Sequence, residues 1–405
     1  MNSKPTQTHR IAELTTPLGK DKLILTSFTA TEHLSRPFEF RIECLSEKPI
    51  PDFNPIIGRN CNIRFNTVAK RVRYFSGVAA EVTWVGGREN KQAYQLVLRP
   101  WFWLLTHTAN SRIFQNKTVV EIIQKVFQDA GFSDFKFDLH EQYKKIEYCV
   151  QYRETHFDFV SRLMEKFGIY YFFEYSADKH MMVMVDTKGG HKPIPGLTQL
   201  RFIGAVERYR DDEEYLSDWQ GGRRFGSGKV TVNAFDFVKP TANMLADKAQ
   251  PGGYAHGSME VFSYPEKYKV GEESDVGQKF AAARLLATQS LDHRRFASGD
   301  APSLFPGGLT KLVKHSVESE NIEYLVVAAT HSFIGEAYRS GTAGGSGDSY
   351  EGSYVFQPSD RPFKALAVTP APVVHGPQTA LVVGPKGEEI YTDKHGRVKL
   401  KFHWD

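Results

Sequence analysis

Two segments carry residue types used by hydrolases and nucleotide-binding proteins, but their spacing fits neither chemistry. A serine-hydrolase elbow places glycine two residues before and two residues after the serine. The run Gly344-Gly345-Ser346-Gly347-Asp348 ends in aspartate where the second glycine is needed. A phosphate-binding loop ends in lysine followed by serine or threonine, whereas Lys229 is followed by Val230. We therefore predict neither a nucleophilic serine nor a nucleotide site in these segments.

Histidine and cysteine form no recognisable metal-binding motif. Zinc sites place their ligands in closely spaced pairs, whereas Cys44, Cys61 and Cys149 are widely separated. His315 and His331, near a predicted strand, come nearest to a metal-binding pair. We interpret them as ordinary surface or core side chains, and we expect no metal and no cofactor.

Paired carboxylates are the one catalytic arrangement that the sequence leaves open. Glu165 and Glu174 flank the aromatic run at 170–173, and two carboxylates at a suitable separation can hydrolyse glycosidic bonds. The aromatic rings could then stack on sugars. In the simpler interpretation the aromatic run is a buried strand and both acids are peripheral. A secreted cell-wall hydrolase is therefore kept as an alternative function.

The composition is that of an ordinary globular protein with many aromatic residues. Of 405 residues, 41% are hydrophobic, 24% charged and 13% aromatic, and aromatic side chains favour β-sheets. A net charge of +4 gives no strong field for nucleic acid. Three cysteines suit a reducing compartment, and residues 1–19 lack the apolar core of a signal peptide. We expect cytoplasmic synthesis without a cleaved leader, and no transmembrane segment.

Turn residues and apolar runs divide the chain into five predicted segments and predict a mainly β fold with an α+β insert. Short strands separated by turn residues are typical of a barrel or sandwich. The predicted segments are a first β-barrel at 8–105, the α+β insert at 106–199, a second β-barrel with a helix at 200–360, an extended proline-rich linker at 361–377, and a further β unit that begins at 378–405.

The insert carries two helices with clear start and stop signals. Thr118 and Glu121 have the spacing of a capping box, and an apolar helical face then runs to Gly131. Thr155 is placed to cap a second helix, and Gly168 is placed to end it. An aromatic strand at 169–175 follows, with a return strand at 180–185.

The second β region contains strands predicted at 229–238 and 321–333, a helix at 275–291, and two polar segments. The run Asp211-Asp212-Glu213-Glu214 is interpreted as a solvated loop or helix start. Residues 335–352 are rich in glycine and serine, so we predict a mobile surface loop there.

The last residues predict a β-hairpin. The turn lies between Thr392 and Gly396, and the strand after it alternates apolar and polar side chains, as a half-buried strand does. Within it we predict structural roles for five residues. Gly396 supplies backbone freedom, Phe402 and Trp404 supply barrel core, and Asp393 and Arg397 stabilise the turn or subunit contacts. A two-stranded ribbon is only marginally stable alone, so it is expected to need further structure.

Four motifs together carry a resemblance over essentially the whole chain. They are Leu34-Ser35-Arg36-Pro37-Phe38-Glu39-Phe40, Leu98-Arg99-Pro100-Trp101-Phe102-Trp103, Gln151-Tyr152-Arg153-Glu154-Thr155, and the segment 390–405 with Phe402-His403-Trp404-Asp405. On these residues the chain resembles the VgrG family, the spike proteins of the bacterial type VI secretion system, which are similar to contractile phage tail hubs. One departure is Thr155-His156, where many relatives are expected to carry Ser-Asp; we expect a changed helix cap and an intact fold.

The resemblance implies a structural role with no enzymatic activity. It implies a homotrimer in which two hub-type β-barrels per chain match the hexameric Hcp tube. It also implies that the last strands begin an OB-like barrel, incomplete here because the needle is missing. Further implied partners are a PAAR-type tip protein, effectors and baseplate proteins, and the implied route is assembly on the secretion apparatus and injection into a target cell. The baseplate hub of a contractile phage tail is the second alternative.

Overall fold

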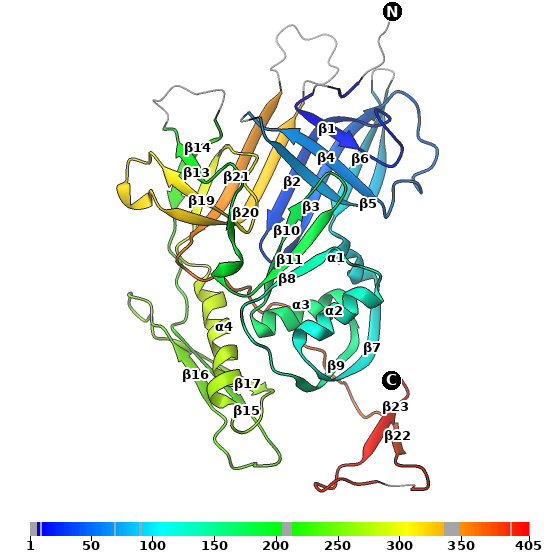
Figure 1. Cartoon of the computed structure of the whole chain (residues 1–405), viewed down its shortest axis with the longest axis vertical. Helices are drawn as coiled ribbons and strands as arrows, with labels where there is room; N and C mark the ends of the chain where they lie inside the picture. The colour runs from blue at the N-terminus through cyan, green and yellow to red at the C-terminus, as the bar shows by residue number, and fades with distance from the viewer. Residues whose placement is uncertain are drawn as a thin grey trace, which may run out of the picture. The chain divides into compact units, whose positions relative to one another are not determined.

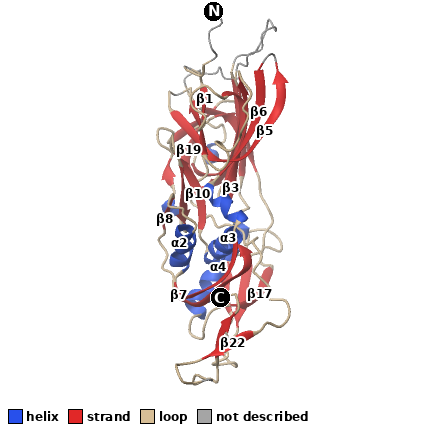
Figure 2. Ribbon diagram, turned by 90° about the vertical axis from the view of Figure 1, so that its right-hand side faces the viewer, coloured by secondary structure: helices blue, strands red, loops and turns tan. Residues whose placement is uncertain are grey.

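The structure is a computed structural model that describes residues 6–8, 10–68, 70–88, 91–204, 213–335, 348–388 and 391–404. Strands dominate it (Figures 1 and 2), so the predicted mainly β class is confirmed. Two compact units are present. The larger unit comprises residues 1–103, 134–141 and 165–367, and the smaller comprises 104–133, 142–164 and 368–405.

The first barrel lies in the larger unit and is built from the N-terminal strands. Their inward residues are large and apolar, as in β3, where Phe38, Phe40 and Ile42 are all buried. Such alternation forces one face of each strand into a common core. The strand order is β1 (Ala12–Thr15), β4 (Asn60–Asn66), β5 (Val72–Arg88), β6 (Lys91–Arg99), β3 (Arg36–Ser46) and β2 (Ile24–His33).

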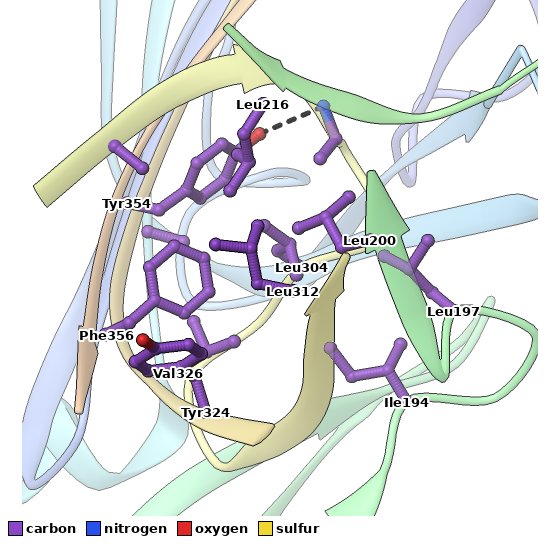
Figure 3. Packing of buried hydrophobic residues seen from close by; sticks show 13 residues of the cluster. Ile194, Leu197, Leu200, Leu216, Leu304, Leu312, Tyr324, Val326, Tyr354 and Phe356 are labelled. Carbon is purple, nitrogen blue, oxygen red and sulfur yellow. Dashed lines mark hydrogen bonds between the residues drawn. The ribbon is translucent and has the colours of Figure 1, made fainter. Parts of the chain in front are cut away.

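The second barrel is closed by backbone pairing all the way round. The order β20-β21-β18-β14-β13-β19 returns to β20 through the β19–β20 pair. Its core holds Leu216, Leu304, Val326, Tyr354 and Phe356 (Figure 3). The strands are β13 (Gln199–Phe202), β14 (Tyr215–Gly221), β18 (Arg295–Asp300), β19 (Gly308–Val313), β20 (Glu323–Ile334) and β21 (Ser349–Pro358), and the short β12 (Lys192–Pro193) pairs in parallel with β19.

One strand pair joins the barrels. β2 and β20 run antiparallel, with Ser27 opposite Ile334 and His33 opposite Ala328. The two barrels thereby share one sheet of 13 strands. Because backbone hydrogen bonds cross this junction, the barrels are fused rather than tethered.

The first barrel is closed differently, by a side chain. β1 lies beside β2, and the Gln7 amide lies between them. Its Nε2 donates to the carbonyls of Leu14 (3.1 Å) and Leu23 (3.2 Å), and its Oε1 accepts from the backbone N–H of Leu14 (2.9 Å) and Leu25 (3.0 Å). The buried amide therefore substitutes for a stretch of ladder, because it pairs backbone groups that burial would otherwise leave unsatisfied.

Two further layers complete the larger unit. A three-stranded sheet has the order β10-β11-β8, and a second has the order β16-β15-β17 with helix α4 packed on it. The predicted aromatic strand and its return strand are confirmed as β10 and β11. The elements are α1 (Trp101–Leu104), β8 (Phe135–Asp138), β10 (Tyr170–Tyr175), β11 (His180–Val185), β15 (Lys229–Ala234), β16 (Ala246–Ala249), β17 (Glu260–Glu266) and α4 (Gln278–Gln289).

The smaller unit contains the predicted insert helices and the last hairpin. Thr118 and Glu121 form the capping box at the start of α2, and Gly131 follows its end at φ 82°. Thr155 caps α3 by accepting from the Asp158 N–H at 2.9 Å, so the helix begins normally despite the departure at His156. The elements are β7 (Ala109–Lys117), α2 (Val119–Asp129), β9 (Ile146–Thr155), α3 (His156–Phe167, whose last turn belongs to the larger unit), β22 (Ala380–Val383) and β23 (Lys399–Phe402).

Three local predictions need correction. β15 ends at Ala234 and not at Val238, since Asp236 turns the chain by accepting from the Val238 N–H. Residues 349–352 belong to β21, because they pair with β20; residues 336–347 of the predicted loop lie outside the described residues. Glu214 is buried, not solvated, whereas Asp211 and Asp212 also lie outside the described residues. Across the described ranges no helix is long and apolar enough to cross a membrane.

Candidate functional site

The most distinctive chemistry in the structure is a buried ionic cluster at the junction of the two barrels. Arg73 on β5 donates from Nη2 to both carboxylate oxygens of Glu32 on β2, at 3.0 and 2.8 Å. His331 on β20 lies 3.4 Å from the same carboxylate, measured from Nε2. Burial opposes the charge on Glu32, but Arg73 and His331 keep the pKa of this carboxyl below its ordinary value. The charged pair therefore lies within the first barrel, and His331 of the second barrel contacts it across the junction.

Aromatic rings enclose the Arg73 guanidinium. Its Cζ lies 4.8 Å from the ring centroids of Phe75 and Tyr175, and 5.4 Å from that of Phe305. These rings come from the first barrel, from β10 and from the loop before β19. A cation held against ring faces is stabilised by their quadrupoles. Arg73 thus connects three parts of the larger unit.

A chain of hydrogen bonds continues from the cluster into the second barrel. His331 Nδ1 lies 2.6 Å from the Tyr350 hydroxyl, which lies 2.9 Å from the Tyr354 hydroxyl. Tyr354 in turn accepts from the Ala301 N–H at 3.2 Å (Figure 3). Burial lowers the pKa of His331. These contacts satisfy the polar groups of an otherwise apolar core.

A separate ionic link joins the barrels through Glu214. Arg71 donates to Glu214 Oε1 at 2.7 Å, the Ser303 hydroxyl donates to the same oxygen at 2.6 Å, and the Ser303 N–H donates to Oε2 at 2.9 Å. Arg71 also donates to the Gly196 carbonyl. An acid surrounded by so many donors is a structural crosslink. No sequence signal distinguished Glu214 from the acidic run before it.

Asp300 lies near this link and provides a test of it. Burial, and then the neighbouring Glu214 charge, raise the pKa of Asp300 to about 6. Because this folded-state pKa lies above the ordinary value of 3.8, the stabilisation that protonated Asp300 contributes is fully present below pH 3.8 and is lost as pH rises through about 6. We expect Asp300→Asn to remove this loss. Urea melts of both proteins between pH 4 and 7 will measure it, and parallel stability profiles would contradict the expectation.

The carboxylates considered for hydrolysis do not form a catalytic pair. Tyr170, Tyr171, Phe172 and Phe173 are all buried, so the packing interpretation of this strand is confirmed. Glu174 is exposed and pairs with Lys136 at 2.8 Å. A cleft of about 370 Å³ is lined by Glu174, Lys136 and Arg73 but not by Glu165. Glu174 therefore lies on the exposed side of β10, and Glu165 does not line the same cleft.

The two histidines considered as a metal pair are not brought together. The His315 N–H donates to Asn321 Oδ1 at 2.9 Å before β20 begins, whereas His331 lies well along that strand and contacts Glu32. No cluster of three or more His, Cys, Asp or Glu side chains that could hold a metal occurs in the part of the chain that the structure describes. Cys44, Cys61 and Cys149 are buried.

The predicted hairpin residues lie in one exposed arm of the smaller unit. Asp393 Oδ1 accepts from the N–H groups of His395 (2.8 Å) and Arg397 (3.0 Å), and Oδ2 accepts from Arg397 Nε (2.6 Å). Gly396 has φ 74°, which favours glycine. β22 and β23 pair antiparallel, with Ala380 opposite Phe402. These contacts support the predicted turn roles of the three residues.

The apolar residues of the arm stack within the smaller unit. The Phe402 and Trp404 rings are parallel to within 17° at 5.0 Å, and Trp404 packs edge-on against Tyr152 at 5.6 Å. Gln378 joins them, because it accepts from Trp404 Nε1 at 3.1 Å and donates to the Tyr152 hydroxyl at 2.7 Å. The role of Phe402 and Trp404 in an OB-like barrel stays a prediction.

We expect Asp393→Ala to open the turn without unfolding the barrels. Hydrogen bonds from the Arg397 backbone and side chain lower the pKa of Asp393 to about 2. Its contribution is therefore present above the ordinary pKa of 3.8 and is lost as pH falls through about 2. Amide exchange of residues 391–402 at neutral pH should accelerate in Asp393→Ala and stay unchanged in Lys394→Ala, a control in the same turn. Equal exchange in both variants would contradict this role.

Two barrels fused through one sheet and joined by the Arg71–Glu214 pair define the fold of the tail-hub class. Over residues 31–336 the chain matches the family of phage tail baseplate hub proteins (GPD). The chain belongs to this family.

Known relatives are named as secretion spike proteins. It is 38% identical over 399 residues to the type VI secretion system spike proteins VgrG1b and VgrG1a of Pseudomonas aeruginosa, covering 98% of this chain and 53% and 61% of theirs. The resemblance to the VgrG family predicted from the sequence is thereby confirmed. The chain spans little more than half the length of these relatives.

Solved structures share the fold. An E. coli protein, c3393, described as a type VI secretion component with structural similarity to the T4 tail proteins gp27 and gp5, aligns with a TM-score of 0.66 at 20% identity, over 96% of this chain and 89% of its own. A prophage MuSo2 tail protein from Shewanella oneidensis aligns with a TM-score of 0.58 at 11% identity, over 87% and 99%. The predicted hub-type barrels are thus found in solved tail proteins.

Proposed function

We propose that this chain is the hub of a type VI secretion spike, a homotrimeric adaptor between the Hcp tube and a membrane-puncturing needle. The observation that carries the proposal is the pair of barrels fused through β2 and β20. Three such chains around one axis present six similar barrels, which suits contact with a hexameric ring. Relatives at 38% identity are named as spike proteins, which favours this function over a cell-wall hydrolase.

The proposed action is mechanical and involves no bond-making. A spike hub must transmit thrust without shearing between its parts. Barrel closure removes free sheet edges, and the Arg71–Glu214 pair joins the two barrels at a further point. The Arg73–Glu32 pair stabilises the first barrel where it meets the second. The hub needs no cofactor for this role.

The assembled spike would be made in the bacterial cytoplasm, built on baseplate proteins and injected with its effectors into a target cell. In this proposal the arm at β22 and β23 leads toward the needle and its PAAR-type tip. The chain would have no specific nucleic-acid partner.

Three measurements test the proposal. Light scattering of the purified chain should give the mass of a trimer, and the trimer should bind purified Hcp rings. A full-length spike carrying this hub should also restore Hcp release from a strain that lacks its own spike. Failure of both ring binding and release would contradict the proposal. Release of soluble sugars from peptidoglycan by the purified chain would instead support the hydrolase.

A further inference from the structure

The sheet formed by β16, β15 and β17 is covered on one face only. Val230, Val232 and Ala246 point to α4 and are buried with Phe280 and Leu285. Residues that alternate with these along each strand point away from α4 and form the outer face of the sheet. Within the described residues, β16 and β17 are both edge strands, and no second layer is assigned to the outer face. A sheet normally buries its apolar face against another layer.

The outer face is strongly apolar at one end. Phe262 is aligned with Thr231 on β15, on the face opposite α4, and is 59% exposed. Tyr264, two residues after Phe262 on β17, and Phe235, directly after the end of β15, have the same parity as the outer-face residues. Both are 58% exposed. Leu245 directly precedes the α4-facing Ala246 of β16, so it belongs to the outer face. Four of the five exposed phenylalanines in the described residues lie between 225 and 262, so the exposure is concentrated.

The other end of the same face carries balanced charges. Lys229 Nζ lies 3.2 Å from Glu260 and 3.7 Å from Asp247. A cation that neutralises neighbouring acids leaves no positive field for nucleic acid or anionic lipid. An apolar centre bordered by polar groups is the arrangement found in protein–protein interfaces.

The size of this surface matches a subunit interface. Aromatic side chains bury roughly 150–250 Å² each. The outer-face side chains Phe235, Leu245, Phe262 and Tyr264 are 49–59% exposed and together present apolar area on the order of 400 Å². A standard interface buries about 800 Å² per partner, of which roughly 60% is apolar. The exposed area is therefore about what one such contact needs.

We infer that a second copy of this chain covers the outer face of β15–β17 in the assembled hub. This inference rests on the proposed homotrimer and identifies one of its contact surfaces. In a closed ring every copy contacts the next through the same pair of surfaces. The outer face of β15–β17 is then covered in all copies. The free edge of β17 adds unpaired backbone groups that a neighbouring chain can bond.

The test replaces Phe262 with glutamate and follows the assembly of the whole chain. Phe262→Glu places a charge at the centre of the apolar area, so sedimentation should show the concentration for half-dissociation raised by at least about tenfold. The exposed Val317 lies outside this surface, so Val317→Glu is the matched control and should assemble like wild type. Equal thermal melting of the dilute proteins verifies folding.

A photo-cross-linking side chain at position 262 identifies the occupant directly. Chain-to-chain adducts are expected with the purified protein and in the presence of Hcp rings. If wild type is trimeric and Phe262→Glu assembles equally well, the inference is overturned while the proposed function stands. Equal dissociation of Val317→Glu, or an adduct to Hcp alone, also overturns it. A wild-type monomer that gives no adduct and binds no Hcp overturns both.

Discussion

Replacing Arg73 by leucine lowers the free energy of unfolding of the barrel unit by about 3–5 kcal/mol, the expected cost of leaving one partner of a buried ion pair alone. Glu32 is buried, and Arg73 supplies both of its guanidinium contacts from Nη2. Leucine also removes the cation that lies against three aromatic rings. Urea denaturation of the full chain, followed by tryptophan fluorescence, measures the loss.

Two comparisons isolate the effect of the buried pair. Arg41→Leu breaks an exposed pair with Glu39 in the same barrel, and such surface pairs contribute roughly 0–1 kcal/mol. Adding Glu32→Gln to Arg73→Leu should recover part of the lost stability, because the unpaired charge is then gone. If Arg73→Leu costs no more than Arg41→Leu, the buried pair does not stabilise the barrel unit.

Replacing Gln7 by glutamate is the second change with a large expected effect, about 2–4 kcal/mol. The carboxylate cannot donate to the carbonyls of Leu14 and Leu23, so two buried acceptors lose their partner and face a negative charge. The gap between β1 and β2 should open locally. Hydrogen exchange at the Leu14 and Leu25 amides measures the opening, and urea melts measure the stability.

Gln92→Glu is the matched control for this substitution. Gln92 is a glutamine of the same barrel whose side chain contacts the exposed Trp84, and surface substitutions usually change stability by less than about 0.5 kcal/mol. Should Gln7→Glu leave both the amide exchange and the melting unchanged, the Gln7 amide would not be the closure of the first barrel.

Local sequence signals were sufficient to predict an element wherever its stabilising contacts join residues that are close in sequence. The capping box of Thr118 and Glu121 and the helix ends at Gly131 and Gly168 are confirmed, because each depends on neighbours within one helical turn. The strand pair at β10 and β11 is also confirmed, because a short turn joins the two strands. Motif resemblance then supplied the family, which periodicity alone could not. The segment boundaries and the barrel role of Phe402 and Trp404 stay predictions.

Long-range contacts were not predictable from the same signals. Glu214 sits in an acidic run that reads as solvated, yet Arg71, 143 positions away, makes it a buried crosslink. Gln7 looks like part of a polar N-terminus, yet it pairs four backbone groups of two strands. Polar residues in such places carry no periodicity, so composition and spacing do not identify them.

Backbone preferences and motifs along the chain were enough to predict most strands and helices, their caps and turns, and the hub family. How the barrels close and fuse, which charges are buried at their junction, and which face of β15–β17 stays open became clear only from the folded structure. Those features depend on residues far apart in the chain that meet only when the whole sheet has formed.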